Sequence, residues 1–320
     1  MNAKIIAFFL SFCLLLCACS APMEQSSVQE ESEQIQTAVE FTDDLGRTVT
    51  VENPQRVAVL LGSFAQVWTL AGGTVQASAD DAWTDFQLDL PEDAVNLGGT
   101  KQLSLEKLLA VQPDFIIAST NTKQHIEWKE TLESTGIPVA YFDVADFGDY
   151  LHMLKICIQI TGREDLYQTY GLDVQQQIDA VLEQSRLRLE NSSAPTVLSL
   201  RASASSIRAK NSQDNVLGEM LLALGCVNIA DSDDSLLENL SMEHILQADP
   251  DFIFIVPLGD DAEGTQANLE QFLAENPAWA QLSAVKNNRV YQMDKSLFGF
   301  KPNHRWGEAY EQVEEILQNG

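Results

Sequence analysis

The chain contains few basic residues. Its 320 residues include 19 Lys and Arg but 47 Asp and Glu, which gives a formal net charge of −28 at pH 7. Nucleic acids are bound through clustered basic side chains that neutralise phosphates, and no basic stripe occurs along this sequence. The charge balance therefore argues against a nucleic-acid-binding protein.

Recognisable catalytic chemistry is also missing. The sequence has no G-x-S-x-G, P-loop or H-E-x-x-H motif, and its four histidines lack the spacing of a metal site. Ser104-Leu-Glu-Lys107 matches the acylating S-x-x-K motif, but neither an S-D-N nor a K-T-G partner exists. We expect neither an enzyme nor direct binding of a bare metal ion, so that a metal would arrive inside a chelate.

An uncharged apolar run occupies residues 5–18, directly after Lys4. It is shorter than the about 20 residues that span a bilayer, which is typical of a signal peptide over residues 1–18. At the end of this run, Leu16-Cys17-Ala18-Cys19 resembles the lipobox of bacterial lipoproteins, with Cys19 as the lipidated residue. The alternative is a plain signal peptide that is cut nearby. Acyl chains would anchor the exported protein to the outer face of the cell membrane.

Residues 19–40 are poor in apolar side chains. Ser20 to Glu40 contains five glutamates and no Lys or Arg, which predicts a flexible acidic tether. Of the five cysteines, only Cys157 and Cys226 belong to the folded part, and both lie in apolar patterns. A single disulfide is possible, but buried free thiols are the preferred interpretation.

Two stretches of the chain repeat each other. SLEKLLAVQPDFIIAST at 104–120 and SMEHILQADPDFIFIVP at 241–257 share a serine, a glutamate, a leucine and Pro-Asp-Phe-Ile at an offset of 241 − 104 = 137. Earlier in each copy, Gly73 aligns with Gly225 at an offset of 152. The difference, 152 − 137 = 15, predicts about fifteen extra residues in the first copy, including much of 79–95.

Strand and helix patterns alternate within both copies, which predicts an α/β fold with parallel sheets and right-handed crossovers. We place an N-terminal lobe at 41–147 and a C-terminal lobe at 192–320. Between them, residues 148–191 carry only helical signal. A single helix over 164–190 would be on the order of 40 Å long at about 1.5 Å per residue, enough to join the lobes stiffly.

Several features together resemble a known family. The lipobox and tether precede D-x-x-G-R-x-V-x-V at 43–51, the two lobes and the bridging helix, and AENPAWAQLSAVKNNRVYQMD and LFGFKPNHRW follow near the end. This pattern, over 41–318, is similar to the substrate-binding lipoproteins of ABC importers for iron-siderophores, haem and cobalamin. The resemblance implies two Rossmann-like lobes around a ligand cleft, and a monomer that delivers a metal chelate to a permease dimer with a cytoplasmic ATPase.

The resemblance also gives the repeated glutamates a role. In the family, an acidic residue in this helix turn of each lobe docks into arginine pockets of the permease, and the matching residues are Glu106 and Glu243. Two carboxylates in pseudo-symmetric lobes suit a twofold permease. The alternative is local: Ser104 and Ser241 are natural N-caps, and a first-turn glutamate gains about 0.3–1 kcal/mol from the helix dipole.

Ligand contacts are expected in loops at the carboxyl ends of the strands. The basic residues among them suit an anionic ligand, most simply a ferric siderophore. The alternatives are a solvated strand edge for the arginines and lysines, and a partly buried surface loop for the tryptophan. The predicted ligand-binding residues are Phe64, Trp83, Lys101, Arg201, Arg208, Lys210, Asn215, Phe298 and His304.

Haem and cobalamin remain alternative ligands. Cobalamin-binding relatives carry a tryptophan where this chain has Thr100 and Leu237, which weakens that alternative. Haem needs an axial Tyr, His or Met, and the sequence does not choose among His125, Tyr141 and His304. A surface sensor or adhesin that uses the same fold without transport is the second class of function. Trp279, in the NPAW motif, is expected in the core.

Overall fold

The structure is a computed structural model that describes residues 38–213, 215–232, 234–259 and 261–320. The predicted signal peptide, Cys19 and most of the 19–40 tether lie outside the described residues. Within the described part, no helix is both long and apolar enough to cross a membrane.

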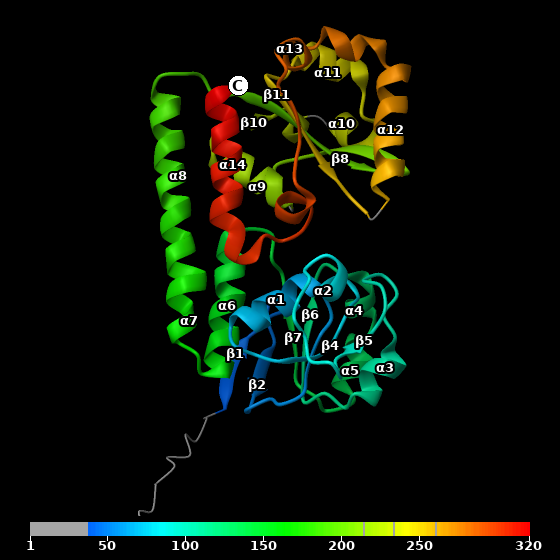
Figure 1. Ribbon diagram of the computed structural model, residues 1–320, viewed down its shortest axis with the longest axis vertical. Helices are drawn as coiled ribbons and strands as arrows, with labels where there is room; N and C mark the ends of the chain where they lie inside the picture. The colour runs from blue at the N-terminus through cyan, green and yellow to red at the C-terminus, as the bar shows by residue number, and fades with distance from the viewer. Residues whose placement is uncertain (1–37, 214, 233, 260) are drawn as a thin grey trace, which may run out of the picture. The chain divides into compact units, whose positions relative to one another are not determined.

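Residues 38–146, here the N lobe, open with an antiparallel hairpin and continue as a parallel sheet (Figure 1). The sheet has the order β5-β4-β3-β6-β7. Strands covered on both faces read as continuous apolar runs, and β6 is buried along its whole length. The strands are β1 (Val39–Thr42), β2 (Thr48–Val51), β3 (Val57–Val59), β4 (Val75–Ser78), β5 (Val95–Asn96), β6 (Phe115–Ser119) and β7 (Val139–Phe142).

Asp43 and Arg47 explain the D-x-x-G-R motif between β1 and β2. The buried Asp43 carboxylate accepts hydrogen bonds from its own turn, from the Arg47 guanidinium and from the Tyr141 backbone N–H. Gly46 adopts φ +74°, which glycine tolerates at no steric cost. The motif therefore fastens the hairpin to the end of the N-lobe sheet.

Five helices cover the N-lobe sheet. Between β6 and β7 the chain forms two short helices that meet at Trp128. The helices are α1 (Gly62–Leu70), α2 (Asp81–Thr84), α3 (Leu105–Ala110), α4 (Lys123–Glu127) and α5 (Lys129–Glu133).

The chain between the two sheets is helical, as expected, but the bridging helix is not uniform. α6 (Phe147–Thr161) ends at Gly162, and α7 (Asp165–Tyr167) leads through a π-helical segment (Gln168–Leu172) into α8 (Asp173–Glu190). A Cβ at Gly171 would lie 3.0 Å from the Tyr167 ring, so a larger residue here would require that ring to shift. The prediction of a regular α-helix over 164–190 was therefore wrong in its first third.

Residues 192–320, here the C lobe, repeat the parallel arrangement. The sheet order is β10-β8-β11-β12, with β9 added antiparallel to β8. The strands are β8 (Thr196–Ser203), β9 (Ser206–Lys210), β10 (Val227–Asn228), β11 (Phe252–Pro257) and β12 (Val290–Gln292). The helices are α9 (Val216–Ala223), α10 (Asp234–Asn239), α11 (Met242–Ala248), α12 (Ala262–Glu275), α13 (Ser283–Lys286) and α14 (Trp306–Asn319), with short 3-10 or π turns at Ile229–Asp231, Pro277–Gln281, Lys295–Gly299 and Asn303–Arg305.

Both offsets of the sequence repeat are present in the structure. α3 and α11 begin at 105 and 242, and β6 and β11 at 115 and 252, each 137 apart. β4 and β10 begin at 75 and 227, which are 152 apart. From the start of β4 to the start of α3 is 105 − 75 = 30 residues, against 242 − 227 = 15 in the C lobe. The N lobe thus carries the predicted extra segment, which contains α2.

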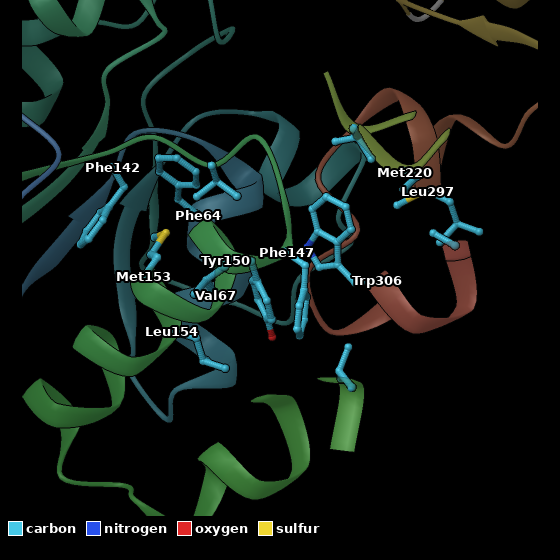
Figure 2. Close-up of a cluster of buried hydrophobic side chains, with 14 of the residues drawn as sticks. Phe64, Val67, Phe142, Phe147, Tyr150, Met153, Leu154, Met220, Leu297 and Trp306 are labelled. Atoms are coloured by element: carbon cyan, nitrogen blue, oxygen red, sulfur yellow. The ribbon is translucent and has the colours of Figure 1, made fainter. Parts of the chain in front are cut away.

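The largest group of buried apolar side chains passes from the N lobe into the C lobe. Figure 2 shows part of it, where the Phe147 ring lies against Trp306 with centroids 6.3 Å apart. Trp279 belongs to a separate C-lobe cluster, as expected. Cys157 and Cys226 are buried free thiols, which confirms the preferred interpretation, and burial raises the pKa of Cys226 to about 12.

Candidate functional site

A cavity of about 1160 Å³ lies between the two lobes and takes its lining from both. In the N lobe, Leu61 and Ser63 follow β3, and Asn121 and Thr122 follow β6. These are the two strands from which the chain leaves in opposite directions along the sheet, and open α/β sheets bind ligands at this point. The fold therefore places the cavity where its topology predicts a ligand.

The C lobe supplies the cavity with basic side chains. Arg201, near the carboxyl end of β8, lines it, and Lys301 lines it from the segment before α14. Burial lowers the pKa of both side chains; for Lys301, the nearby Asp143 carboxylate opposes this effect and the charge of Arg201 adds to it. The Lys301 ammonium donates a hydrogen bond to the Val144 carbonyl of the N lobe. Within the described chain, neither cation has a carboxylate in an ion pair.

Three of the nine predicted ligand-binding residues line the cavity: Lys101, Arg201 and Asn215. Lys101 is exposed and contributes its charge at the N-lobe rim. Asn215 is occupied mainly with structure, since its Oδ1 accepts from the Gly218 N–H and its Nδ2 donates to two carbonyls of the preceding turn. Among these three, Arg201 is the half-buried charged residue of the lining.

Two predicted phenylalanines lie in the core instead of the cavity. Phe64 and Phe298 have 0% and 1% of their surface exposed. Successive residues of a helix point about 100° apart, and in α1 the side chain of Ser63 takes the lining position while Phe64 turns inward. Their assignment to the lining was therefore wrong.

Four further predicted residues also lie outside the lining. Trp83 packs against the main core, and His304 places its ring edge-on to Tyr170, 6.0 Å away. On the β8–β9 hairpin, Arg208 is exposed and Lys210 half-buried, and alternation puts both on the face that carries Arg201. They extend the positive face beyond the cavity.

Phe86, Phe300 and Lys301 line the cavity but were not among the predicted residues. Phe86 lies in the same insertion as Trp83, and Phe300 and Lys301 lie in the same terminal segment as Phe298. The sequence located both segments correctly. It did not show which side chain of each segment faces inward, because neither is a long periodic element.

Asp81 places a buried carboxylate at the cavity wall. Its side chain accepts a hydrogen bond from the Gly62 N–H, 2.9 Å away, at the start of α1. Burial raises the pKa of Asp81 to about 6, and the nearby Asp80 and Asp85 carboxylates add to this effect. A Cβ at Gly62 would lie 2.6 Å from the Ala82 nitrogen, so this close approach requires glycine.

None of the described residues that line the cavity is a His, Tyr, Met or Cys. His125 is buried in the N lobe, where its Nδ1 accepts from the Ser119 N–H and burial lowers its pKa to about 4. Tyr141 donates to the His125 carbonyl, 3.2 Å away. Nor do the described residues hold any group of three or more His, Cys, Asp or Glu suited to a metal ion.

Glu106 and Glu243 occupy equivalent places at the starts of α3 and α11. Both are exposed, and neither forms an ion pair within the described residues. The Ser104 hydroxyl accepts from the Lys107 N–H at 3.2 Å and caps α3, whereas the Ser241 side chain makes no such bond. The cap is therefore present in one copy only, although the glutamate is present in both.

Two α/β lobes with a cavity between them are the architecture of a solute-binding protein. A family profile described as "Periplasmic binding protein" matches residues 57–297, well over half of the chain. The chain belongs to this periplasmic binding protein family, whose members bind solutes for transport and are not enzymes.

Individual relatives resemble the chain over most of its length. It is 25% identical over 307 residues to the putative ABC transporter substrate-binding lipoprotein YhfQ of Bacillus subtilis (strain 168), covering 90% of each chain. It is 25% identical over 296 residues to the Fe(3+)-citrate-binding protein YfmC of the same organism, covering 91% of this chain and 89% of the relative. An ABC transporter substrate-binding protein from Listeria monocytogenes EGD-e shares the fold, with a TM-score of 0.67 at 21% identity over 84% of this chain and all of that one.

Proposed function

We propose that this protein is the extracytoplasmic binding lipoprotein of an ABC importer and that it captures an anionic ferric chelate, such as a ferric siderophore or ferric citrate. Family membership supports the importer role, and the relative YfmC is a Fe(3+)-citrate-binding protein. Lipidation of Cys19 would hold the chain at the outer face of the membrane. The delivered chelate then passes to a permease dimer driven by an ATPase.

The observation that carries the ligand assignment is the pair of cations at the cavity, Arg201 and Lys301. Burying like charges near one another is unfavourable unless an opposite charge joins them. No carboxylate of the described chain forms an ion pair with either. A chelate with net negative charge supplies that opposite charge, and the guanidinium fits a carboxylate or catecholate in a two-point hydrogen bond.

Haem is a weaker candidate, because the lining offers no axial ligand for its iron. A siderophore or citrate complex fills the coordination shell of iron with its own oxygen atoms and needs none. For cobalamin, Thr100 lines the cavity without an aromatic face, and Leu237 packs against the C-lobe core. Both observations favour the ferric chelate.

The exposed Glu106 and Glu243 support docking to the permease. They project one carboxylate from each lobe, at the ends of the strands that also border the cavity. A receptor with one positive pocket per permease subunit fits such a pair. Their lack of ion-pair partners in the described chain leaves both charges available to it.

The test is an equilibrium screen of the purified mature protein by tryptophan fluorescence, against ferric citrate, ferric catecholate and hydroxamate siderophores, haemin and cobalamin. We expect saturable quenching by at least one anionic ferric chelate and weaker binding of the same chelate at high salt. Selective binding of haemin or cobalamin would contradict the ligand assignment. Binding of none of the probes would count against the importer role itself.

A further inference from the structure

The insertion of the N lobe reaches the C lobe at its tip. The Asp85 carboxylate lies 3.2 Å from the Lys295 ammonium, and the rings of Phe86 and Phe300 lie with their centroids 5.5 Å apart. The Lys295 ammonium also stands over the Phe300 ring, 4.7 Å from its centroid. One ion pair and one aromatic pair therefore cross the cleft at this point, and a cation–π contact within the C lobe connects them.

The N-lobe side of this contact is firmly anchored. Trp83, Leu88 and Leu90 of the insertion pack against the main core. The backbone N–H of Phe86 donates to the Asp81 carbonyl at 2.9 Å, which holds the tip close to the end of α2. The insertion therefore presents Asp85 and Phe86 from a fixed base, and the role of Trp83 is to secure that base.

The C-lobe side is braced as well. The Asp294 carboxylate accepts from the Ser296 N–H at 2.8 Å, at the start of the turn that carries Lys295. The Arg305 guanidinium donates to the Ser296 hydroxyl at 3.2 Å, which ties this turn to the start of α14. Contact between the two sides therefore joins two rigid elements.

The contact between the two lobes forms part of the cavity wall. Phe86 and Phe300 both line the cavity, whereas Asp85 and Lys295 stand behind them with 21% and 24% of their side-chain surface exposed. The ion pair is thus accessible to salt, while the aromatic pair faces the ligand space. The C-lobe copy of the repeat lacks this insertion, so the contact has no symmetric counterpart.

We propose that Asp85 and Lys295 form a latch that holds the Phe86–Phe300 wall of the cavity closed, so that the cleft opens on this side only when the latch parts. The latch belongs to the protein without ligand; its effect on ligand exchange rests on the proposed function. Salt weakens the latch, because dissolved ions screen a partly exposed ion pair.

Hydrogen exchange of the ligand-free mature protein tests the latch without any knowledge of the ligand. In Asp85→Asn, backbone amides of 294–301 in the opposite lobe should exchange about two- to fivefold faster, and in Lys295→Met those of 79–95 should do so. Asp89→Asn is the matched control, since it removes an exposed carboxylate of the same insertion. Faster exchange confined to the mutated segment itself would overturn the latch.

A charge exchange separates the latch from local damage. The double variant Asp85→Lys, Lys295→Asp restores an ion pair of reversed polarity, and we expect it to return protection in both segments towards that of the native protein. Exchange in the double variant as fast as the sum of the single variants would contradict an interaction between the two residues. Failure of the ligand screen would leave this result unaffected.

Discussion

Arg201 and Arg208 lie directly opposite each other on β8 and β9, with both side chains on the same face of the hairpin. Like charges at opposed positions of an antiparallel pair destabilise a sheet. The opposite face of the same hairpin is apolar and packs in the C-lobe core. The hairpin therefore maintains an unfavourable concentration of positive charge beside the cavity, as a site for an anion requires.

Replacing Arg201 by Gln should weaken binding of the ferric chelate by about 10- to 100-fold, the usual loss for one charge-assisted hydrogen bond. The variant should unfold at the same urea concentration as the native protein or a slightly higher one, because a repulsion is removed. Arg208→Gln is the control, since Arg208 does not line the cavity. Both variants are measured by fluorescence titration. Equal losses of affinity would mean that Arg201 contributes only to the general positive potential near the cavity and makes no specific contact with the chelate.

Loss of either docking carboxylate should separate transport from binding. Glu106→Ala and Glu243→Ala should each abolish or strongly reduce uptake of the radiolabelled ferric chelate by cells, while the affinity of the purified protein stays unchanged. Glu130→Ala, which removes an exposed first-turn glutamate of α5, should leave uptake intact. Weaker chelate binding in the Glu106 or Glu243 variant would contradict a docking role.

Arg188 of α8 and Glu314 of α14 form a two-point ion pair at 2.9 and 3.0 Å, with only 2% of the Glu314 side chain exposed. Removing one partner of a buried pair leaves the other uncompensated, so Glu314→Ala should lower the free energy of unfolding by about 3–5 kcal/mol. Glu315→Ala, one position along on the exposed side, should change it by less than about 0.5 kcal/mol. Urea denaturation followed by circular dichroism measures both.

The raised pKa of Asp81 predicts that the difference in stability between the native protein and Asp81→Asn depends on pH. Its pKa of about 6 in the folded protein is above the ordinary 3.8, so the ionised form is penalised by folding. That penalty is present in full above pH 6 and disappears as the pH falls from about 6 towards 3.8. Asp81→Asn should therefore stabilise the protein at pH 7.5, by up to about 3 kcal/mol.

The comparison for Asp81 is urea unfolding of both proteins at several pH values between 4 and 7.5. The gain from Asp81→Asn should shrink towards zero at the acid end, because the native carboxyl is then protonated as well. A gain of the same size at every pH would mean that Asp81 does not titrate as its buried position requires.

Much of the fold followed from the sequence, since buried parallel strands and the 137-residue repeat leave strong periodic signals. β6 and β11 are apolar along most of their length, and their shared Pro-Asp-Phe-Ile aligns the two sheets. The π-helical segment, where Gly171 lies close to the Tyr167 ring, did not follow from the sequence. Periodicity carries no information about such a contact.

The site was predictable at the level of segments, and less so at the level of residues. Arg201 was predicted because it follows the apolar strand pattern at 196–200 in a basic segment, but the same reasoning included Arg208 and Lys210, which do not line the cavity. Phe86 was missed in favour of Trp83, since the insertion folds back on itself and packs its larger ring inward. Which aromatic of a short irregular segment faces a cavity depends on tertiary packing.

The core that passes through Phe147 and Trp306 has a consequence for how the protein unfolds. Because this apolar cluster contains side chains of both lobes and of the helices between them, loss of either lobe would expose part of the core of the other. The chain should therefore denature in one cooperative step, with calorimetric and van't Hoff enthalpies that agree. The same shared core limits how far the lobes separate. A permease that docks to Glu106 and Glu243 would therefore distinguish the loaded protein by a small change in the spacing of these two carboxylates.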